Sequence, residues 1–216
     1  MHTVIFAGGT VRPGRAVNEA ITTADYIIAA DSGARTAFSY GLTPAVIVGD
    51  FDSLHMSEQE IRNRGSEFMR APVEKDETDT ELALQIGLER GATRITLLGA
   101  LGGARFEHTI ANVLLLTGFP DTPIHIVDGP SICWLLHGPS STAISGQPDD
   151  LLSLFPLAGN ATGVTTTNLY YPLHNDTLAF GKPRGVSNKL TSTEATVSLE
   201  SGMLLVIYTN AEELHE

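Results

Sequence analysis

The chain has 216 residues and a formal net charge of −12, which allows one domain or two small ones and argues against nucleic-acid binding, because no basic patch offsets the charge. Its single cysteine excludes an internal disulfide framework and a zinc site built from several cysteines. Because no apolar run approaches the length of a membrane span and the start lacks a signal peptide, we expect a soluble cytoplasmic protein without a membrane partner.

The first half of the sequence alternates short apolar runs with segments that have helix signals. Two capping-box patterns, at residues 57–60 and 78–81, mark helix starts. Such alternation predicts a parallel sheet with helices on its faces. The predicted strands span residues 4–7, 26–30, 46–48, 67–71, 95–98 and 124–127, and the predicted helices span residues 16–24, 34–40, 57–65, 78–90 and 106–117.

After about residue 129 the pattern changes to short β-rich runs between Gly, Pro, Ser and Asn turns. Residues 195–199 show the alternation of a half-buried strand. We therefore predict an α/β domain over residues 1–129 and an all-β sandwich domain over residues 130–216. Its predicted strands span residues 132–136, 151–157, 177–180, 195–199 and 203–208.

Two aspartates, Asp50 and Asp52, directly follow the apolar run at 46–48. In an extended backbone they would project from one face, and adjacent carboxylates repel each other unless a cation or a proton lies between them. Mg²⁺ bridged to phosphates is one interpretation. A solvated acidic turn is the other, and this pair alone does not decide between them.

More acidic residues are expected at the same edge of the sheet, because ligands of open parallel sheets bind outside the carboxyl ends of the strands. Asp31 follows the second predicted strand, and Asp76, Thr78 and Asp79 lie at a predicted helix start. One carboxylate there could cap the helix N-terminus, which leaves the other to face the cleft.

A glycine-rich loop that contains Gly102 and Gly103 precedes the next predicted helix, and its backbone N–H groups could approach phosphate. Arg105 could clamp phosphate, or it could form a surface ion pair with Glu107. His108 is either a structural or a catalytic histidine.

In the β-rich half, the pair Tyr170 and Tyr171 and the run that contains Ser187 and Asn188 offer ring stacking and polar groups for an aromatic ligand. They are equally compatible with ordinary strand and turn residues.

Five motifs in this order resemble the thiamine pyrophosphokinase (thiamine diphosphokinase) family. They are ADSGA (30–34), GDFDS (49–53), EKDETDTELAL (74–84), LGALGGARFEHTIAN (98–112) and GVSNK (185–189). The resemblance covers nearly the whole chain and implies a Rossmann-like α/β nucleotide domain, a β-sandwich domain and a homodimer with a shared active site. It also implies a Mg²⁺-dependent transfer of the pyrophosphoryl group of ATP to the hydroxyl of thiamine, which gives thiamine diphosphate and AMP.

The resemblance assigns roles to individual residues. The metal ligands would be Asp50, Asp52 and Asp79. The residues expected to act in catalysis are Asp31, Asp52, Asp79, Arg105 and Glu107, with Asp31 as the candidate to orient or deprotonate the hydroxyl. Nucleotide contacts would come from Asp76, Thr78, Gly102, Gly103, Arg105 and His108. The thiamine ring would lie against Tyr171, Ser187 and Asn188.

Three positions depart from the family pattern: Glu107 replaces the usual Asp, Ala104 is an additional residue after the glycines, and Tyr171 stands where Trp is frequent. Two other functions are compatible with parts of the sequence. The Asp-x-Asp motif at Asp50 is similar to the nucleophile motif of haloacid-dehalogenase-type phosphohydrolases, but that family places it on the first strand. A non-catalytic thiamine-binding module would have little need for so many clustered carboxylates.

Overall fold

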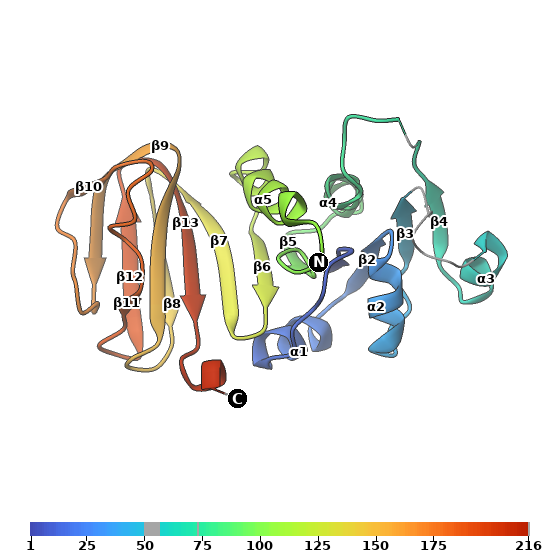
Figure 1. The fold of residues 1–216 in the computed structure, drawn as a ribbon, viewed down its shortest axis with the longest axis horizontal. Helices are drawn as coiled ribbons and strands as arrows, with labels where there is room; N and C mark the ends of the chain where they lie inside the picture. Colours follow the sequence, from blue (N-terminus) through green and yellow to red (C-terminus); the bar gives the residue numbers. More distant parts are fainter. Residues whose placement is uncertain (50–56, 73, 216) are drawn as a thin grey trace. The chain divides into compact units, whose positions relative to one another are not determined.

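The structure is a computed structural model that describes residues 1–49, 57–72 and 74–215. It divides into two compact units (Figure 1): unit 1 comprises Met1–Leu115 and Thr122–Gly129, and unit 2 comprises Leu116–Asp121 and Pro130–Glu216. Helices and strands together confirm the mixed α/β class. Within the described ranges, no helix is both long enough and apolar enough to cross a membrane.

Unit 1 contains a parallel sheet in the strand order β4-β3-β2-β1-β5-β6. Its strands are β1 (His2–Phe6), β2 (Tyr26–Ala30), β3 (Val46–Gly49), β4 (Glu67–Arg70), β5 (Arg94–Leu98) and β6 (Ile124–Asp128). All five residues of β1 are buried, as expected for a parallel strand covered on both faces. Strand order reverses between β1 and β5, and ligands of open α/β sheets bind at such a switch point.

The helices of unit 1 are α1 (Arg15–Thr22), α2 (Gly33–Ser39), α3 (Glu58–Asn63), α4 (Asp79–Glu89) and α5 (Phe106–Leu115). The first predicted capping box is confirmed, because Ser57 Oγ accepts the N–H of Glu60 at 3.3 Å while the Glu60 carboxylate accepts the N–H of Ser57 at 2.8 Å. In the second, Thr78 Oγ1 accepts the N–H of Glu81 at 3.1 Å. These caps fix where α3 and α4 begin.

Two histidines, the buried His2 on β1 and the partly buried His125 on β6, lie near the amino ends of their strands in the unit 1 sheet. His2 Nε2 lies 2.9 Å from Thr96 Oγ1 on β5, and Thr96 is in register with His125 on β6. Burial lowers the pKa of both His2 and His125 below the usual value of 6.5, because the charged form of the ring loses its hydration. Burial therefore favours the neutral form of both rings in the folded protein.

Unit 2 contains antiparallel strands in the order β7-β13-β9-β12-β8, and β10 and β11 also pair with β9. The strands are β7 (Ser131–His137), β8 (Ser140–Ser145), β9 (Leu151–Thr167), β10 (Asp176–Leu178), β11 (Asn188–Lys189), β12 (Glu194–Leu199) and β13 (Ser201–Thr209); 3₁₀ turns span Leu116–Gly118 (η1) and Glu212–His215 (η2). Burial alternates along β12 and along residues 151–156 of β9, so the inward side chains of these segments contribute to one aliphatic core.

A buried carboxylate anchors the end of β13 to the start of β9. Asp150 is 2% exposed, and its Oδ2 accepts hydrogen bonds from the Tyr208 hydroxyl at 2.6 Å and from the N–H of Gln147 at 2.7 Å. Its Oδ1 accepts the N–H of Ala211 at 2.8 Å. Burial, together with the hydrogen bond to Asp150, raises the pKa of Tyr208 to about 12.

Three strands of unit 2 differ from the sequence prediction, and one of them is the unpredicted two-residue strand β11 (Asn188–Lys189). The strand predicted at residues 151–157 continues to Thr167, although Ala158 and Gly159 have φ angles of 58° and 123°. Strand β8 (Ser140–Ser145) was not predicted, because its run of small polar residues contains a single buried side chain, Ile144.

Candidate active site

A cavity of about 480 Å³ lies at the switch point of unit 1, beyond the carboxyl ends of β1, β2 and β5. The starts of α4 and α5 complete its wall. The residues that line it are Ala7, Gly8, Gly9, Ala30, Asp31, Ser32, Lys75, Glu77, Thr78, Asp79, Thr80, Gly99, Ala100, Gly102, Gly103, Ala104, Arg105, His108 and Asn112. Carboxylates, cationic side chains and glycine backbone therefore line the same cavity.

Two glycine-containing loops, one after β1 and one after β5, contact each other in the cavity wall. The N–H of Gly9, just after β1, donates to the carbonyl of Gly99, just after β5, at 3.0 Å. A Cβ atom at Gly9 would lie 2.0 Å from the carbonyl oxygen of Gly102, and one at Gly102 would lie 2.7 Å from that of Thr10. Only glycine fits this contact, which brings bare backbone from both loops to the cavity.

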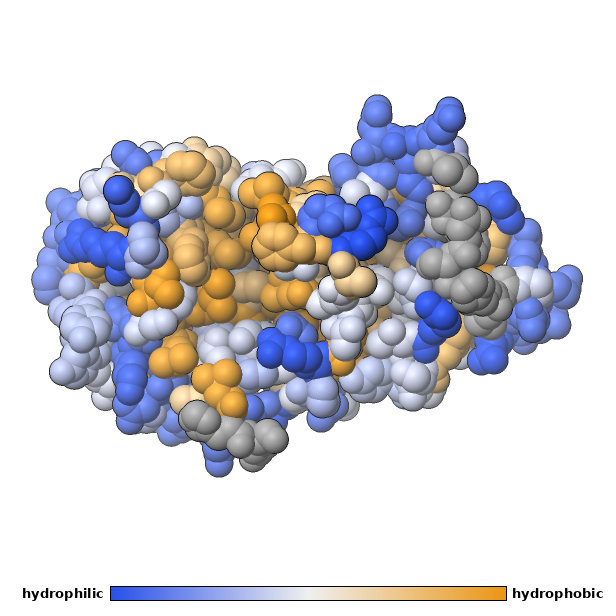
Figure 2. Space-filling model, in the orientation of Figure 1, coloured by the Kyte–Doolittle hydropathy of each residue, from blue (hydrophilic) through white to orange (hydrophobic). Residues whose placement is uncertain are grey.

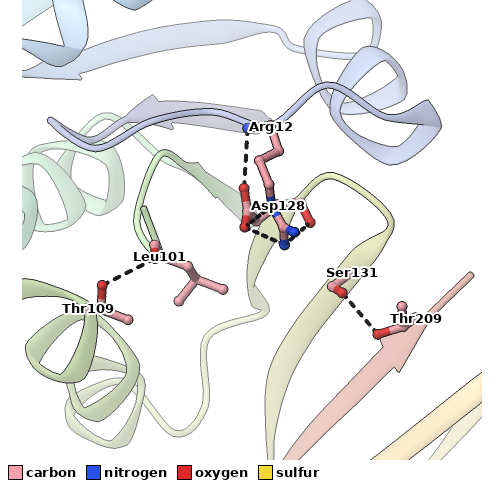
Figure 3. A network of polar contacts seen from close by, with 6 residues as sticks. All are labelled: Arg12, Leu101, Thr109, Asp128, Ser131 and Thr209. Carbon is pink, nitrogen blue, oxygen red and sulfur yellow. Dashed lines mark hydrogen bonds and ion pairs between the residues drawn. The ribbon is translucent and has the colours of Figure 1, made fainter. Parts of the chain in front are cut away.

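The ends of both loops are tied to the rest of unit 1 (Figure 3). Thr109 Oγ1, on α5, donates to the carbonyl of Leu101 at 3.2 Å. Asn112 Nδ2, also on α5, donates to the carbonyl of Ala100 at 2.9 Å. On the other loop, the Arg12 guanidinium lies 2.7 Å from Asp128, whose side chain is 8% exposed. These contacts hold the backbone of the loops in place before a ligand arrives.

Asp31 lies directly after β2 in an unusual backbone conformation. Its φ angle is 46°, its N–H donates to the carbonyl of Val48 at 2.8 Å, and it lines the cavity. A left-handed conformation at a non-glycine residue costs on the order of 1 kcal/mol and is frequent at functional sites. The predicted position of Asp31 at the carboxyl edge of the sheet is confirmed.

Of the three predicted site residues near the start of α4, two line the cavity and one does not. Asp79 is the first helical residue and lines the cavity, where its Oδ1 lies 2.5 Å from Lys75 Nζ. Thr78 also lines the cavity, but its hydroxyl accepts the Glu81 N–H as the helix cap. Asp76 is exposed and, among the described residues, does not line the cavity.

At the start of α5, Arg105 and Glu107 pair with each other. Arg105 Nε donates to Glu107 Oε1 at 2.8 Å, and this hydrogen bond lowers the pKa of Glu107. Their side chains are 70% and 67% exposed. Arg105 and His108 line the cavity with Gly102 and Gly103, so these predicted nucleotide contacts are brought together.

The predicted metal ligands Asp50 and Asp52 lie outside the described residues. Within the described ranges, no group of three or more His, Cys, Asp or Glu side chains could hold a metal ion. Asp31 and Asp79 are nevertheless two carboxylates that line the same cavity, and carboxylate oxygen is a preferred ligand of Mg²⁺.

In unit 2, the structure brings Tyr171, Ser187 and Asn188 into one cluster. Asn188 Oδ1 accepts the N–H of Tyr171 at 3.0 Å, and Asn188 Nδ2 donates to the Tyr171 carbonyl at 2.7 Å. The N–H of Ser187, a residue with a φ angle of 58°, donates to Ser153 Oγ at 3.0 Å. The ring of Tyr171 is 67% exposed and meets Tyr170 edge to face at 4.8 Å.

Sequence reasoning assigned no role to several residues of the cavity. Lys75 lies among the acidic residues of the motif at 74–84, and a lysine in such a run is a signal for an internal ion pair. Gly8 and Gly9 come directly after a predicted strand, and glycines at that position indicate a loop whose backbone can approach a ligand. Asn112 gave no signal, because its partner is a backbone carbonyl 12 residues earlier in the chain.

Comparisons with known proteins agree with this arrangement. Residues 17–127 match the family model "Thiamin pyrophosphokinase, catalytic domain", and residues 142–204 match "Thiamin pyrophosphokinase, vitamin B1 binding domain". The chain is 28% identical over 183 residues to thiamine pyrophosphokinase of Bacillus subtilis (strain 168), covering 83% of this chain and 85% of the relative. It is 27% identical over 174 residues to thiamin pyrophosphokinase 1 of Caenorhabditis elegans, covering 76% of this chain and 70% of the relative.

Solved structures give the same result over almost the full length. The crystal structure of the Bacillus subtilis thiamine pyrophosphokinase superposes with a TM-score of 0.84 at 28% identity, covering 98% of this chain and 100% of that one. A thiamin pyrophosphokinase family protein from Enterococcus faecalis superposes with a TM-score of 0.81 at 28% identity, covering 97% and 99%. The resemblance seen in the motifs is thereby confirmed, and the chain belongs to the thiamin pyrophosphokinase family.

Proposed function

We propose that this protein is a thiamine diphosphokinase, which transfers the pyrophosphoryl group of ATP to the hydroxyl of thiamine and releases AMP. The observation that carries the proposal is the presence of both family domains in one chain. All residues that line the switch-point cavity except Ala7, Gly8 and Gly9 lie within the catalytic match. We further propose that residues 1–129 form a Rossmann-like nucleotide-binding domain and residues 130–216 a thiamine-binding β-sandwich domain, in a cytoplasmic enzyme.

In the proposed reaction, the thiamine hydroxyl oxygen forms a bond to the β-phosphorus of ATP. The bond between that phosphorus and the α,β-bridging oxygen breaks, and the bridging oxygen leaves on AMP with the electron pair. Asp31 lines the cavity and accepts the hydroxyl proton. Arg105 and the backbone of Gly102 and Gly103 bind phosphate oxygens, since positioning and charge stabilisation dominate this chemistry.

The residues present fit a magnesium ion by the chemistry of their donor atoms. Asp79 lines the cavity as a partly buried carboxylate, and we propose that it binds Mg²⁺ together with Asp50 and Asp52. When bound, the ion would offset the negative charge of the phosphate oxygens. Glu107 would keep Arg105 oriented through its hydrogen bond.

The thiamine ring is proposed to lie against Tyr171, with Asn188 holding the backbone of Tyr171 in place. Ser187 would offer its hydroxyl to the polar edge of the ring. We also propose a homodimer in which nucleotide and thiamine residues of one active site come from different copies. An apolar stripe on α5, formed by Phe106, Ile110 and Leu114, is 72%, 45% and 51% exposed and supports an interface (Figure 2).

Neither alternative function is favoured. A haloacid-dehalogenase-type mechanism would place Asp50 after the first strand of the sheet, whereas β1 and β2 precede β3 in this chain. A non-catalytic thiamine-binding module would not require the catalytic-domain match over residues 17–127.

The experiment that tests the proposal is product analysis after incubation with ATP, thiamine and Mg²⁺. We expect AMP and thiamine diphosphate in equal amounts. ADP with thiamine monophosphate would overturn the pyrophosphoryl transfer, and inorganic phosphate with a phosphorylated Asp50 would favour the phosphohydrolase. Thiamine binding without any AMP would favour the binding module.

A further inference from the structure

Lys75 is a cation inside the cavity for which neither the motifs nor the proposed mechanism has a role. Its Nζ lies 2.5 Å from Asp79 Oδ1, and the two side chains are 13% and 26% exposed. Among the described residues, Asp79 is the only side chain that pairs with Lys75. An ammonium group carries three N–H donors, so this pair leaves donors that can turn toward another anion.

The position of Lys75 is unfavourable for the helix that follows it. The N-terminus of α4 carries the positive end of the helix dipole, which stabilises the Asp79 carboxylate and disfavours a nearby ammonium. Thr78 already caps the helix through the Glu81 N–H, so Lys75 is not needed to start it. A largely buried lysine at this place is better explained by the anions that the cavity receives.

We propose that Lys75 is a further catalytic residue, which pairs with Asp79 in the nucleotide-free protein and contacts the phosphate groups of ATP when Asp79 becomes a metal ligand. The inference deepens the proposed function, because it assumes that the switch-point cavity binds a metal–triphosphate. The exchange of partners leaves no charge uncompensated: Asp79 passes from an ammonium to a metal ion, and Lys75 passes from a carboxylate to phosphate.

The four-carbon stem of lysine suits such an exchange. Lys75 and Arg105 line the same cavity, and lysine acts on phosphate as a mobile point charge where arginine acts as a fixed fork. Its ammonium would stabilise charge on the phosphate oxygens as the bond to AMP breaks, without giving up a proton.

The first test measures metal binding by the protein without nucleotide. In Lys75→Met the competing cation is gone, so the dissociation constant for Mn²⁺, used as a spectroscopic substitute for Mg²⁺, should fall by about tenfold. Lys182→Met removes the same charge from an exposed position of unit 2 and should leave it unchanged. A merely structural lysine would give unchanged or weaker metal binding, and either result would overturn the proposed pairing.

The second test measures phosphate binding with inorganic tripolyphosphate and Mg²⁺, so it needs neither thiamine nor turnover. Lys75→Met should weaken tripolyphosphate binding by about tenfold, and Lys75→Arg should restore most of it. Equal affinity in wild type and Lys75→Met would overturn the contact with phosphate. If Lys75→Met does not fold, Lys75→Gln and Lys75→Arg give the same comparison.

The two proposals fail in different ways. A wild-type protein that forms no AMP would refute the proposed function. The Mn²⁺ and tripolyphosphate comparisons would still test whether Lys75 pairs with Asp79 and contacts phosphate. A wild type that makes AMP normally, with both affinities insensitive to Lys75→Met, would refute the role of Lys75 alone.

Discussion

Replacing Gly9 by alanine tests whether the contact between the two glycine loops supports both stability and nucleotide binding. The new Cβ would lie 2.0 Å from the Gly102 carbonyl oxygen and 2.4 Å from that of Gly99. Both are backbone atoms, so no side chain can rotate away, and the loops must separate. Separation would also break the hydrogen bond from the Gly9 N–H to Gly99.

The size of the effect follows from these two losses. Overpacking costs about 1–3 kcal/mol and a lost hydrogen bond about 1 kcal/mol, so we expect the free energy of unfolding of unit 1 to fall by roughly 2–4 kcal/mol. A displacement near 1 Å at the cavity should also lower kcat/KM for ATP by about 100-fold.

The assay is chemical denaturation followed by circular dichroism at 222 nm, because α1 to α5 all belong to unit 1. Gly118→Ala, in unit 2, is the control, since no atom beyond its chain neighbours and the backbone of its own turn lies within 4 Å of the position of its Cβ. It should change stability by less than about 0.5 kcal/mol. An equally small change in Gly9→Ala, with normal ATP kinetics, would refute the argument.

Three further predictions follow from the other buried groups and from the proposed dimer. Burial lowers the pKa of His2 and His125 in the folded state only, so the unfolded chain binds more protons; the free energy of unfolding should be constant above about pH 6.5 and fall below it. Asp150→Asn replaces one hydrogen-bond-accepting oxygen by an NH₂ group that faces other donors. The free energy of unfolding should therefore fall by about 2–4 kcal/mol, measured by thermal or chemical unfolding, while tripolyphosphate binding stays intact. Mixing inactive Asp79→Asn and Tyr171→Asp proteins should restore about a quarter of wild-type activity, because half of the dimers then contain one site without either change.

Two of these predictions have a control variant, and the third has an outcome that would contradict it. His174→Gln, at an exposed position, should keep the fall in stability at low pH, whereas loss of that fall in His174→Gln would contradict the role of the buried pair. Asp149→Asn changes an aspartate whose side chain is 77% exposed and should be nearly neutral. If verified subunit exchange restores no activity, each active site is built within one chain.

The strands and helices of unit 1 were predictable because local signals agree with the tertiary fold. The strand predicted at 26–30 coincides with β2, and the capping pattern at Ser57 places the start of α3. Strands buried on both faces read as continuous apolar runs, so tertiary packing reinforces what the sequence indicates.

Unit 2 was harder to predict, because its long strand contains residues that normally end strands. Gly159 and Gly163 on β9 have φ angles of 123° and 67° and look like turn residues in the sequence. Their left-handed conformations are accommodated within the strand, and the register of β9 against β13 shifts between Ser201 and Met203. Such irregularities depend on the partner strand, which the local sequence does not reveal.

In the candidate site, the sequence indicated which residue types gather at the carboxyl edge but not how they pair. Asp31 and Asp79 line the cavity as expected. The ion pair of Asp79 with Lys75 depends on the path of the chain before α4, and no propensity describes that path. The contact of Asn188 could not be predicted either, because its side-chain amide forms hydrogen bonds with the backbone of Tyr171, 17 residues earlier in the chain.

The position of β6 determines how the two units could be expressed separately. Strand β6 pairs with β5 and carries Asp128, which binds Arg12, but residues 116–121 between α5 and β6 belong to unit 2. A fragment that stops at Leu115 would lose β6 and leave the edge of β5 open to pairing with other chains, which favours aggregation. A fragment that continues to Gly129 keeps this edge covered and retains the Arg12 contact.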